Sequence, residues 1–157
     1  MSGLIELKTY FDPDDGFLPE VSVAGYKPEE IVSIYERLVS ISSPSSLESE
    51  LWHIPSESNV KLSQFLCAAE VMLKGEAESF HMLLKELIFE GVILPDLGAF
   101  IFKDEITLDY RRGSEWPDQV IRLFTNLISK VMTPRSEIVV KHQECETLFK
   151  NYFSRSA

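Results

Sequence analysis

The sequence predicts an α+β fold, in which about four to five helices pack against a mainly antiparallel sheet as a single pair of layers. Three observations predict this class. Helical and strand-like patterns alternate irregularly along the chain, one pair of adjacent strands has the pattern of a hairpin, and no internal repeat interrupts the order. At 157 residues the chain suits one well-filled core, so we expect a single domain spanning residues 1–157.

The first part of the chain is predicted to form a strand and then a helix. Residues 4–11 alternate between apolar and polar side chains, and residues 11–17 (FDPDDGF) are rich in turn formers. From Pro28 the apolar period becomes helical, because proline suits a first turn and a stripe of apolar side chains follows it. The stripe consists of Ile31, Ile34, Tyr35, Leu38 and Val39. Residues 42–50 are a polar linker, and a short strand follows at 51–55.

The middle of the chain is predicted to be mostly helical. Residues 60–90 divide into two helical pieces that break at Lys74-Gly75. The second piece places one group of apolar side chains on one side and ends at Gly91, which is a plausible helix stop. That group consists of Phe80, Leu83, Leu84, Leu87 and Ile88.

A hairpin, a long helix and two short elements complete the prediction. The hairpin arms are residues 98–103 and 105–111, with a tight connection around Asp104. Residues 115–132 carry the strongest helical pattern, through Val120, Phe124, Leu127, Ile128 and Val131. A last strand at 137–142 and a short helix at 145–153 follow.

Residues 109–124 (DYRRGSEWPDQVIRLF) form the corner between the second hairpin arm and the long helix. Gly113 can adopt the positive φ that a sharp corner needs, and Ser114 can cap the helix start. Glu115 and Asp118 lie in the first turn, where the helix dipole favours negative charge. The residue types therefore suit a structural corner.

The same corner is also the best candidate for a binding site. Trp116 can fold back over the sheet and lock the corner, which is the structural interpretation. Arg111 and Arg112 are not explained in this way, and they either pair with nearby carboxylates or face a partner.

The charge of the chain is strongly acidic and unevenly distributed. The net charge is −10, and residues 1–60 contribute −8, whereas residues 101–157 contribute +1. Acidic surfaces repel nucleic acids and anionic membranes and attract basic partners, although acidity also simply keeps proteins soluble. The bases near the corner are interrupted by acids, so no positive patch for phosphates is expected. We therefore predict a basic protein partner and no binding to nucleic acid or membranes.

No motif indicates a catalytic, metal or cofactor site. The histidines His53, His81 and His142 lie far apart in the sequence, and none has a second ligand at zinc spacing. When Asp12 is counted as the first residue of a calcium loop, Gly16 is the fifth and not the required sixth, so a calcium loop is not expected. Phosphate-binding glycine loops and nucleophile elbows are absent from the sequence. We predict a protein without cofactor, metal or catalytic activity, and a small cytoplasmic enzyme with an unrecognised site is the alternative.

The two cysteines favour a reduced, cytoplasmic protein. Cys67 lies in an apolar segment, and Cys145 lies among carboxylates that disfavour its thiolate. The sequence does not decide whether they pair. The N-terminus lacks the pattern of a signal peptide, and no stretch is long and apolar enough for a membrane helix.

The strand ITLDY, the following R-x-G-x-x-W and the amphipathic helix resemble segments of small bacterial immunity proteins, over residues 99–131. Those proteins are encoded beside secreted toxins and neutralise them by tight binding. The resemblance implies an acidic, cytoplasmic, non-catalytic protein, and it transfers no set of functional residues. In size and charge alone the chain is also similar to acidic secretion chaperones, which usually begin with a helix.

The sequence therefore predicts an acidic binding protein, most specifically an immunity protein that occludes a toxin. An acidic surface would steer a basic partner, and aromatic anchors would complete a dry contact. The candidate partner-binding residues are Asp12, Asp14, Asp15, Glu48, Glu50, Arg111, Arg112 and Trp116.

Overall fold

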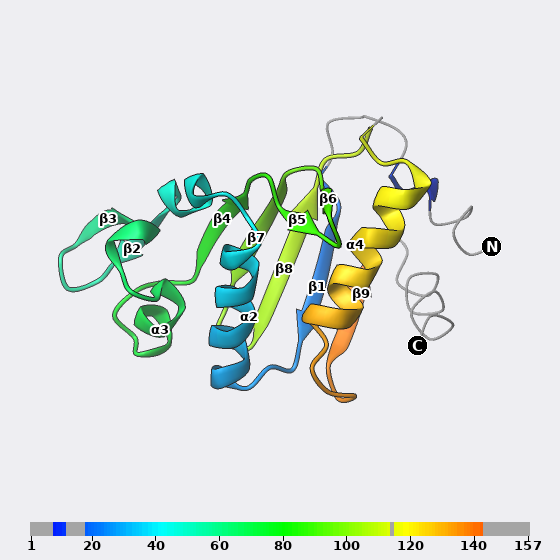
Figure 1. Ribbon diagram of the computed structural model, residues 1–157. Coiled ribbons are helices and arrows are strands. Elements are labelled where there is room, and N and C mark those ends of the chain that lie inside the picture. The colour runs from blue at the N-terminus through cyan, green and yellow to red at the C-terminus, as the bar shows by residue number, and fades with distance from the viewer. Residues whose placement is uncertain (1–7, 12–17, 114, 143–157) are drawn as a thin grey trace.

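The centre of the molecule is a five-stranded antiparallel sheet (Figure 1). The computed structural model describes residues 8–11, 18–113 and 115–142. The strand order is β4-β7-β8-β1-β9, and every neighbouring pair is antiparallel. The strands are β1 (Glu20–Ala24), β4 (Phe80–Leu84), β7 (Leu97–Ile101), β8 (Glu105–Tyr110) and β9 (Val139–His142).

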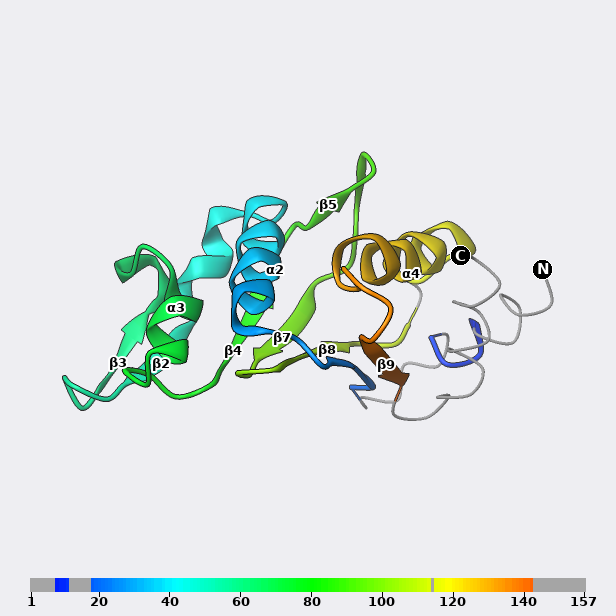
Figure 2. The ribbon, with the colours of Figure 1, turned by 90° about the horizontal axis from the view of Figure 1, so that it is seen from below.

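Two long helices lie on the same face of this sheet, so the main body has two layers (Figure 2). Helix α2 (Pro28–Ser40) lies toward the β4 side, and helix α4 (Asp118–Val131) lies toward β1 and β9 (Figure 1). Both helices are amphipathic and turn their apolar stripe to the sheet. Residues such as Ile31, Leu38, Phe124 and Leu127 are fully buried.

The register of the strands brings one apolar row after another to the helix-covered face. Val21 of β1 lies opposite Leu108 of β8, and Ala99 of β7 lies between Leu108 and Met82 of β4. All four of these side chains have no solvent exposure. Because side chains alternate along a strand, the residues between them point to the other face. No described helix covers that second face (Figure 2).

A smaller unit, which we call the β2–β3 lobe (residues 44–78), lies beside β4 (Figure 1). It consists of two 3₁₀ turns, η1 (Pro44–Glu48) and η2 (Leu62–Gln64), strands β2 (Glu50–His53) and β3 (Ser58–Lys61), and helix α3 (Ala68–Leu73). Hydroxyls of the lobe accept hydrogen bonds from the segment of β4: the Ser49 hydroxyl from the Leu83 amide at 3.2 Å, and the Ser46 hydroxyl from the Lys85 amide at 2.9 Å. A second small hairpin, β5 (Ile88–Phe89) and β6 (Val92–Ile93), follows β4.

The α+β class and the antiparallel sheet are confirmed, but the expected four to five helices are not. The described residues contain three α-helices, and only α2 and α4 exceed two turns. The main error is the helix predicted to end at Gly91, where residues 80–84 form β4. In FHMLL the side chains of Phe80, Met82 and Leu84 also alternate with His81 and Leu83, and pairing with β7 overrides the helical preference of leucine.

The start of the chain also differs from the prediction. Residues 8–11 form a turn, closed by a hydrogen bond from the Phe11 amide to the Lys8 carbonyl, and not part of a strand. The first described strand is instead β1, which the sequence analysis did not predict. Of the region expected to be helical before Lys74, α3 is confirmed, whereas residues 58–61 are strand β3. The final helix expected at 145–153 lies outside the described residues.

The hairpin of β7 and β8, helix α4 and strand β9 agree with the prediction to within a few residues. The start of α4 is different in detail. It begins at Asp118, and its N-cap position is occupied by Pro117 without a side-chain hydrogen bond. Gly113 has φ = 145°, so the corner does use a backbone conformation that favours glycine.

An ion pair ties the loop before β9 to the start of α2. The Arg135 guanidinium donates from Nε to Glu30 Oε2 at 3.0 Å and from Nη2 to Glu30 Oε1 at 2.9 Å. Hydrogen bonds from Arg135 hold the pKa of the Glu30 carboxyl below its usual value. This bidentate geometry joins segments that are distant in sequence. It fixes the start of α2 relative to the loop between α4 and β9.

Trp116 is the centre of an aromatic cluster beneath the corner. Its exposed fraction is 1%, and its ring lies 4.8 Å from Phe11, 5.2 Å from Tyr110 and 5.3 Å from Phe124 between ring centroids. The indole Nε1 donates to the Arg111 carbonyl at 2.7 Å, which satisfies its only polar atom. Trp116 therefore locks the corner, as the structural interpretation expects.

The aromatic cluster continues to a buried histidine at the end of β9. His142 is 2% exposed, and its Nε2 lies 2.7 Å from the Tyr110 hydroxyl. Burial, and to a lesser extent the positive charge of Arg112, lower the pKa of His142 to about 4. The folded protein therefore holds this imidazole neutral at pH values where an exposed histidine is charged.

Over the described residues, no helix is both long and apolar enough to cross a bilayer.

Replacing Trp116 should strongly destabilise the protein. We expect Trp116→Ala to lower the free energy of unfolding by about 3–5 kcal/mol, because a fully buried aromatic leaves a cavity. Chemical denaturation followed by circular dichroism measures this. The matched control is Trp52→Ala, since Trp52 is 40% exposed and should show a clearly smaller loss. Equal losses in the two variants would contradict the central role of Trp116.

The buried histidine should make stability depend on pH. Its folded pKa of about 4 lies below the value of about 6.5 expected in the unfolded chain, so the unfolded chain binds more protons between these values. Stability is thus lost as the pH falls from about 6.5 to about 4, by about 3 kcal/mol for this group. Denaturant unfolding of the wild type and of His142→Gln should show a steeper acid loss in the wild type. Parallel pH profiles would refute this assignment.

Candidate functional site

The β2–β3 lobe exposes large apolar side chains within an acidic surface. Trp52, Ile54 and Leu66 have exposed fractions of 40%, 46% and 107%. Residues 44–78 contain six acidic and two basic side chains, a formal charge of −4. Single exposed apolar side chains are ordinary, but three in one small acidic lobe are typical of a surface that binds another protein.

The hairpin of the lobe positions these side chains. In β2, Leu51 is buried while Glu50 and Trp52 point outward, and in the register Trp52 lies opposite Asn59 and Glu50 opposite Lys61. Trp52 is therefore held on a paired strand and not on a loose loop. The hairpin edge is joined to the segment after α3, because the Glu78 amide donates to the Trp52 carbonyl at 3.1 Å. A rigidly mounted indole loses little further freedom when it binds.

Two of the predicted partner-binding residues belong to this lobe. Glu48 and Glu50 are both exposed, and Glu48 Oε2 lies 2.7 Å from Lys61 Nζ. The hydrogen bond to Glu48 raises the pKa of Lys61. Exposed ion pairs of this kind contribute little to stability. A cation of a partner could therefore replace Lys61 beside Glu48 at a small cost in free energy. The predicted residues Asp12, Asp14 and Asp15 lie outside the described part of the chain.

The other predicted residues belong to the corner, where the structure separates them. Arg111 is exposed, whereas Arg112 is 8% exposed and Trp116 is 1% exposed. A partner could contact Trp116 only if the aromatic cluster opened. The guanidinium of Arg112 is buried, and its positive charge contributes to the lowered pKa of His142. Of this group only Arg111 is available at the surface.

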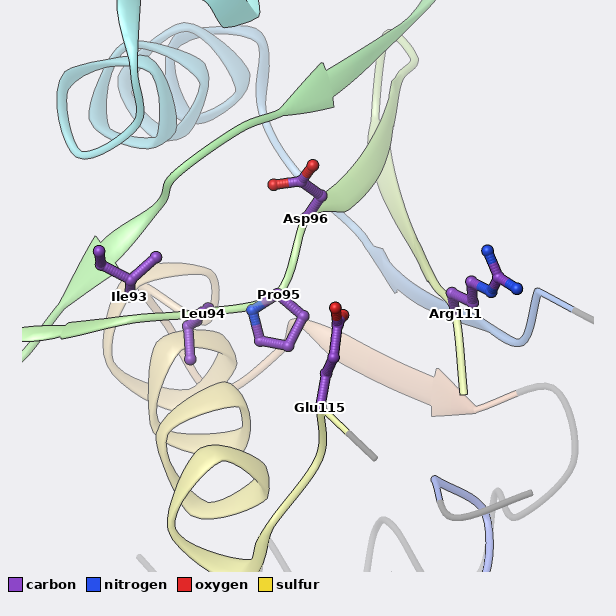
Figure 3. A pocket seen from close by; sticks show the side chains of 6 residues that line it. All are labelled: Ile93, Leu94, Pro95, Asp96, Arg111 and Glu115. Atoms are coloured by element: carbon purple, nitrogen blue, oxygen red, sulfur yellow. The ribbon is translucent and has the colours of Figure 1, made fainter. Parts of the chain in front are cut away.

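A shallow pocket of about 530 Å³ lies beside Arg111 (Figure 3). Its lining combines the end of the β5–β6 hairpin with the corner, through Ile93, Leu94, Pro95, Asp96, Arg111 and Glu115. In Figure 3 the Arg111 guanidinium lies apart from the Asp96 and Glu115 carboxylates. The ionisable groups that line this pocket therefore do not converge on one point, whereas those of a catalytic pocket do.

On the sheet face without helices, a histidine and an aspartate meet across β7. His81 Nε2 of β4 lies 2.8 Å from Asp109 Oδ2 of β8, and Gly98 of the intervening strand leaves the space for them. A Cβ at Gly98 would collide with both side chains. The Phe100 ring lies 4.4 Å from the His81 ring between centroids. A histidine held by a carboxylate is also found in catalytic triads, which require a nucleophile beside it.

Two described hydroxyls of this face, those of Ser22 and Thr107, pair with each other. Ser22 Oγ and Thr107 Oγ1 lie 3.1 Å apart, and Thr107 is 5% exposed. This arrangement links β1 to β8 and uses both hydroxyls for the sheet. The His81–Asp109 pair is therefore best interpreted as a cross-strand clamp.

The apolar part of the lobe surface is not among the residues that the sequence predicts. For LWHIP the sequence predicts only a strand, and its tryptophan is not among the predicted partner-binding residues. The available signal was period-2 alternation, because Glu50 and Trp52 share a face that the glutamate marks as solvated. No such signal existed for Leu66, whose exposure depends on the path of the chain between η2 and α3.

Comparison of the chain with protein-family models, curated proteins and solved structures yielded no match, so the geometry described above is the basis for a functional assignment.

Proposed function

We propose that this chain is a non-catalytic binding protein that captures a basic protein partner through the β2–β3 lobe. The observation that carries the proposal is the exposure of Trp52, Ile54 and Leu66 in a lobe whose residues have a formal charge of −4. Carboxylates accelerate the encounter with a basic partner, and apolar side chains then form the desolvated centre of the contact.

The most specific form of this proposal is an immunity protein that occludes a toxin domain. Its support is the acidic charge of the chain and the resemblance over residues 99–131. Within that segment the corner has a structural role, since Trp116 is buried. The proposal therefore assigns the binding role to the lobe and assigns the corner to the stability of the scaffold.

The partner can be sought directly. The product of the reading frame beside this gene is co-expressed with the chain, and complex formation is followed by size-exclusion chromatography and by interferometry. Protection of the host from a toxic neighbour would support the immunity function. A neighbouring product that neither binds nor harms the host argues against that specific form.

The tryptophan of the lobe should control the lifetime of the complex. We expect Trp52→Ala to raise the dissociation rate by at least about 30-fold, the effect of a hot-spot residue, while the association rate changes little. Leu83→Ala is the matched control, because Leu83 is 37% exposed on β4, outside the lobe. A wild-type dissociation rate for Trp52→Ala would exclude the lobe as the contact centre.

Carboxylates of the lobe should control the rate of encounter. The triple variant Glu50→Gln, Glu76→Gln and Glu78→Gln should associate more slowly and show a weaker dependence on salt, because it removes three charges from the exposed lobe. A control with the same change of charge elsewhere is Glu86→Gln, Asp104→Asn and Glu115→Gln. If both triple variants lose the same rate, the steering comes from the net charge of the chain and not from the lobe.

A further inference from the structure

Three potential metal ligands from two helices converge beside the β2–β3 lobe. They are the Glu36 carboxylate on α2, the Cys67 thiol at the N-cap of α3, and the Glu70 carboxylate in the first turn of α3. One ligand atom from each lies within 4.8 Å of the other two. The spacing from Cys67 to Glu70 places both on one side of α3, and the packing of α2 against α3 supplies the third ligand.

The cysteine is the feature that distinguishes this group from an ordinary acidic surface. Cys67 is a free thiol with an exposed fraction of 8%, and its side chain makes no hydrogen bond that caps α3. It faces a pocket of about 440 Å³ that Glu36 and Glu70 also line. Apolar neighbours such as Leu62 and Phe65 form other parts of this wall. The thiol is thus largely removed from bulk water but open toward two exposed carboxylates.

The geometry is close to that of a bound zinc ion. Zinc lies about 2.3 Å from sulfur and about 2.0–2.2 Å from carboxylate oxygen, so tetrahedral ligands are roughly 3.5 Å apart. The ligand atoms lie within 4.8 Å of one another, which exceeds this spacing by about 1.3 Å at most. Both glutamates are exposed, so rotation of their side chains closes the difference without movement of either helix.

The chemistry of the three ligands selects the metal. Calcium and magnesium prefer sets of six or more oxygen ligands, whereas thiolate favours zinc and related first-row ions. Without a metal, burial and the two carboxylates disfavour the thiolate and raise the pKa of Cys67. Metal binding would favour the thiolate, because the sulfur coordinates the ion as its proton is released to solvent.

We propose that Glu36, Cys67 and Glu70 bind one zinc ion, with water as the fourth ligand. This site is independent of the proposed partner. The ion joins α2 of the main body to α3 of the lobe, and it therefore holds the lobe in a fixed position on the scaffold.

The proposal is tested with the metal alone. The protein is prepared without an affinity tag in a Cys145→Ser background, so that Cys67 is its sole thiol. Competition with a chromophoric chelator should show one zinc ion per chain. Co²⁺ should give a thiolate-to-cobalt absorption band in the near ultraviolet and the strong visible bands of four-coordinate cobalt. Zinc should also slow alkylation of Cys67 and raise the melting temperature.

The decisive variant is Cys67→Ser, which nearly keeps the size of the side chain and places a residue at the N-cap of α3 that is favoured there. We expect it to lose the near-ultraviolet band and to bind zinc at least about 100-fold more weakly. Removal of a residue that only hydrogen-bonds to a metal ligand already lowers metal affinity about 10–100-fold. Glu36→Gln and Glu70→Gln should also weaken zinc binding, while the control Glu57→Gln, an exposed glutamate of the same lobe, should not. No zinc binding by the wild type, or equal binding by Cys67→Ser, would overturn the proposal.

Discussion

The structure depends on the burial of one apolar sheet face under only two long helices. Helix α2 covers the β4 side and α4 covers the β1 and β9 side, so every strand must present its apolar row to the same layer. A shift by one residue in any strand would move that row to the uncovered face, where no described helix could bury it. The bidentate ion pair of Arg135 with Glu30 links the loop after α4 to the start of α2 and so fixes the position of α2 relative to that loop.

The sequence predicts elements whose pattern is local and unambiguous, and it fails where tertiary pairing decides. The sequence of α4 fits a helix alone and that of the β7–β8 hairpin fits strands alone, and both elements agree closely with the prediction. FHMLL fits a helix as well as a strand, and only its pairing with β7 selects the strand. Strand β1 is absent from the prediction although EVSVA alternates between polar and apolar side chains, because five residues are a short pattern and the partners of the strand, β8 and β9, are distant in sequence.

The candidate site follows the same division. Charge is readable from the sequence, so the sequence alone can propose Glu48 and Glu50 as partner-binding residues. Exposure is not readable, because it depends on which neighbours the chain brings close. Trp116 and Trp52 are the same residue type, yet one is the centre of the core and the other lies on the surface. The proximity of Glu36 to Cys67 cannot be read from the sequence either, since it arises from packing between two helices.

The position of β1 has a consequence for the order in which the molecule assembles. The first described strand lies between β8 and β9, the last two strands of the sheet. During synthesis β1 leaves the ribosome early, but its first partner is more than half the chain behind it. The β2–β3 lobe, whose strands pair locally, can form in that interval, whereas the pairing of β1 must wait for β8 and β9. Folding is therefore expected to be slow and to close last at β1, which makes this strand the segment most in need of protection in the nascent chain.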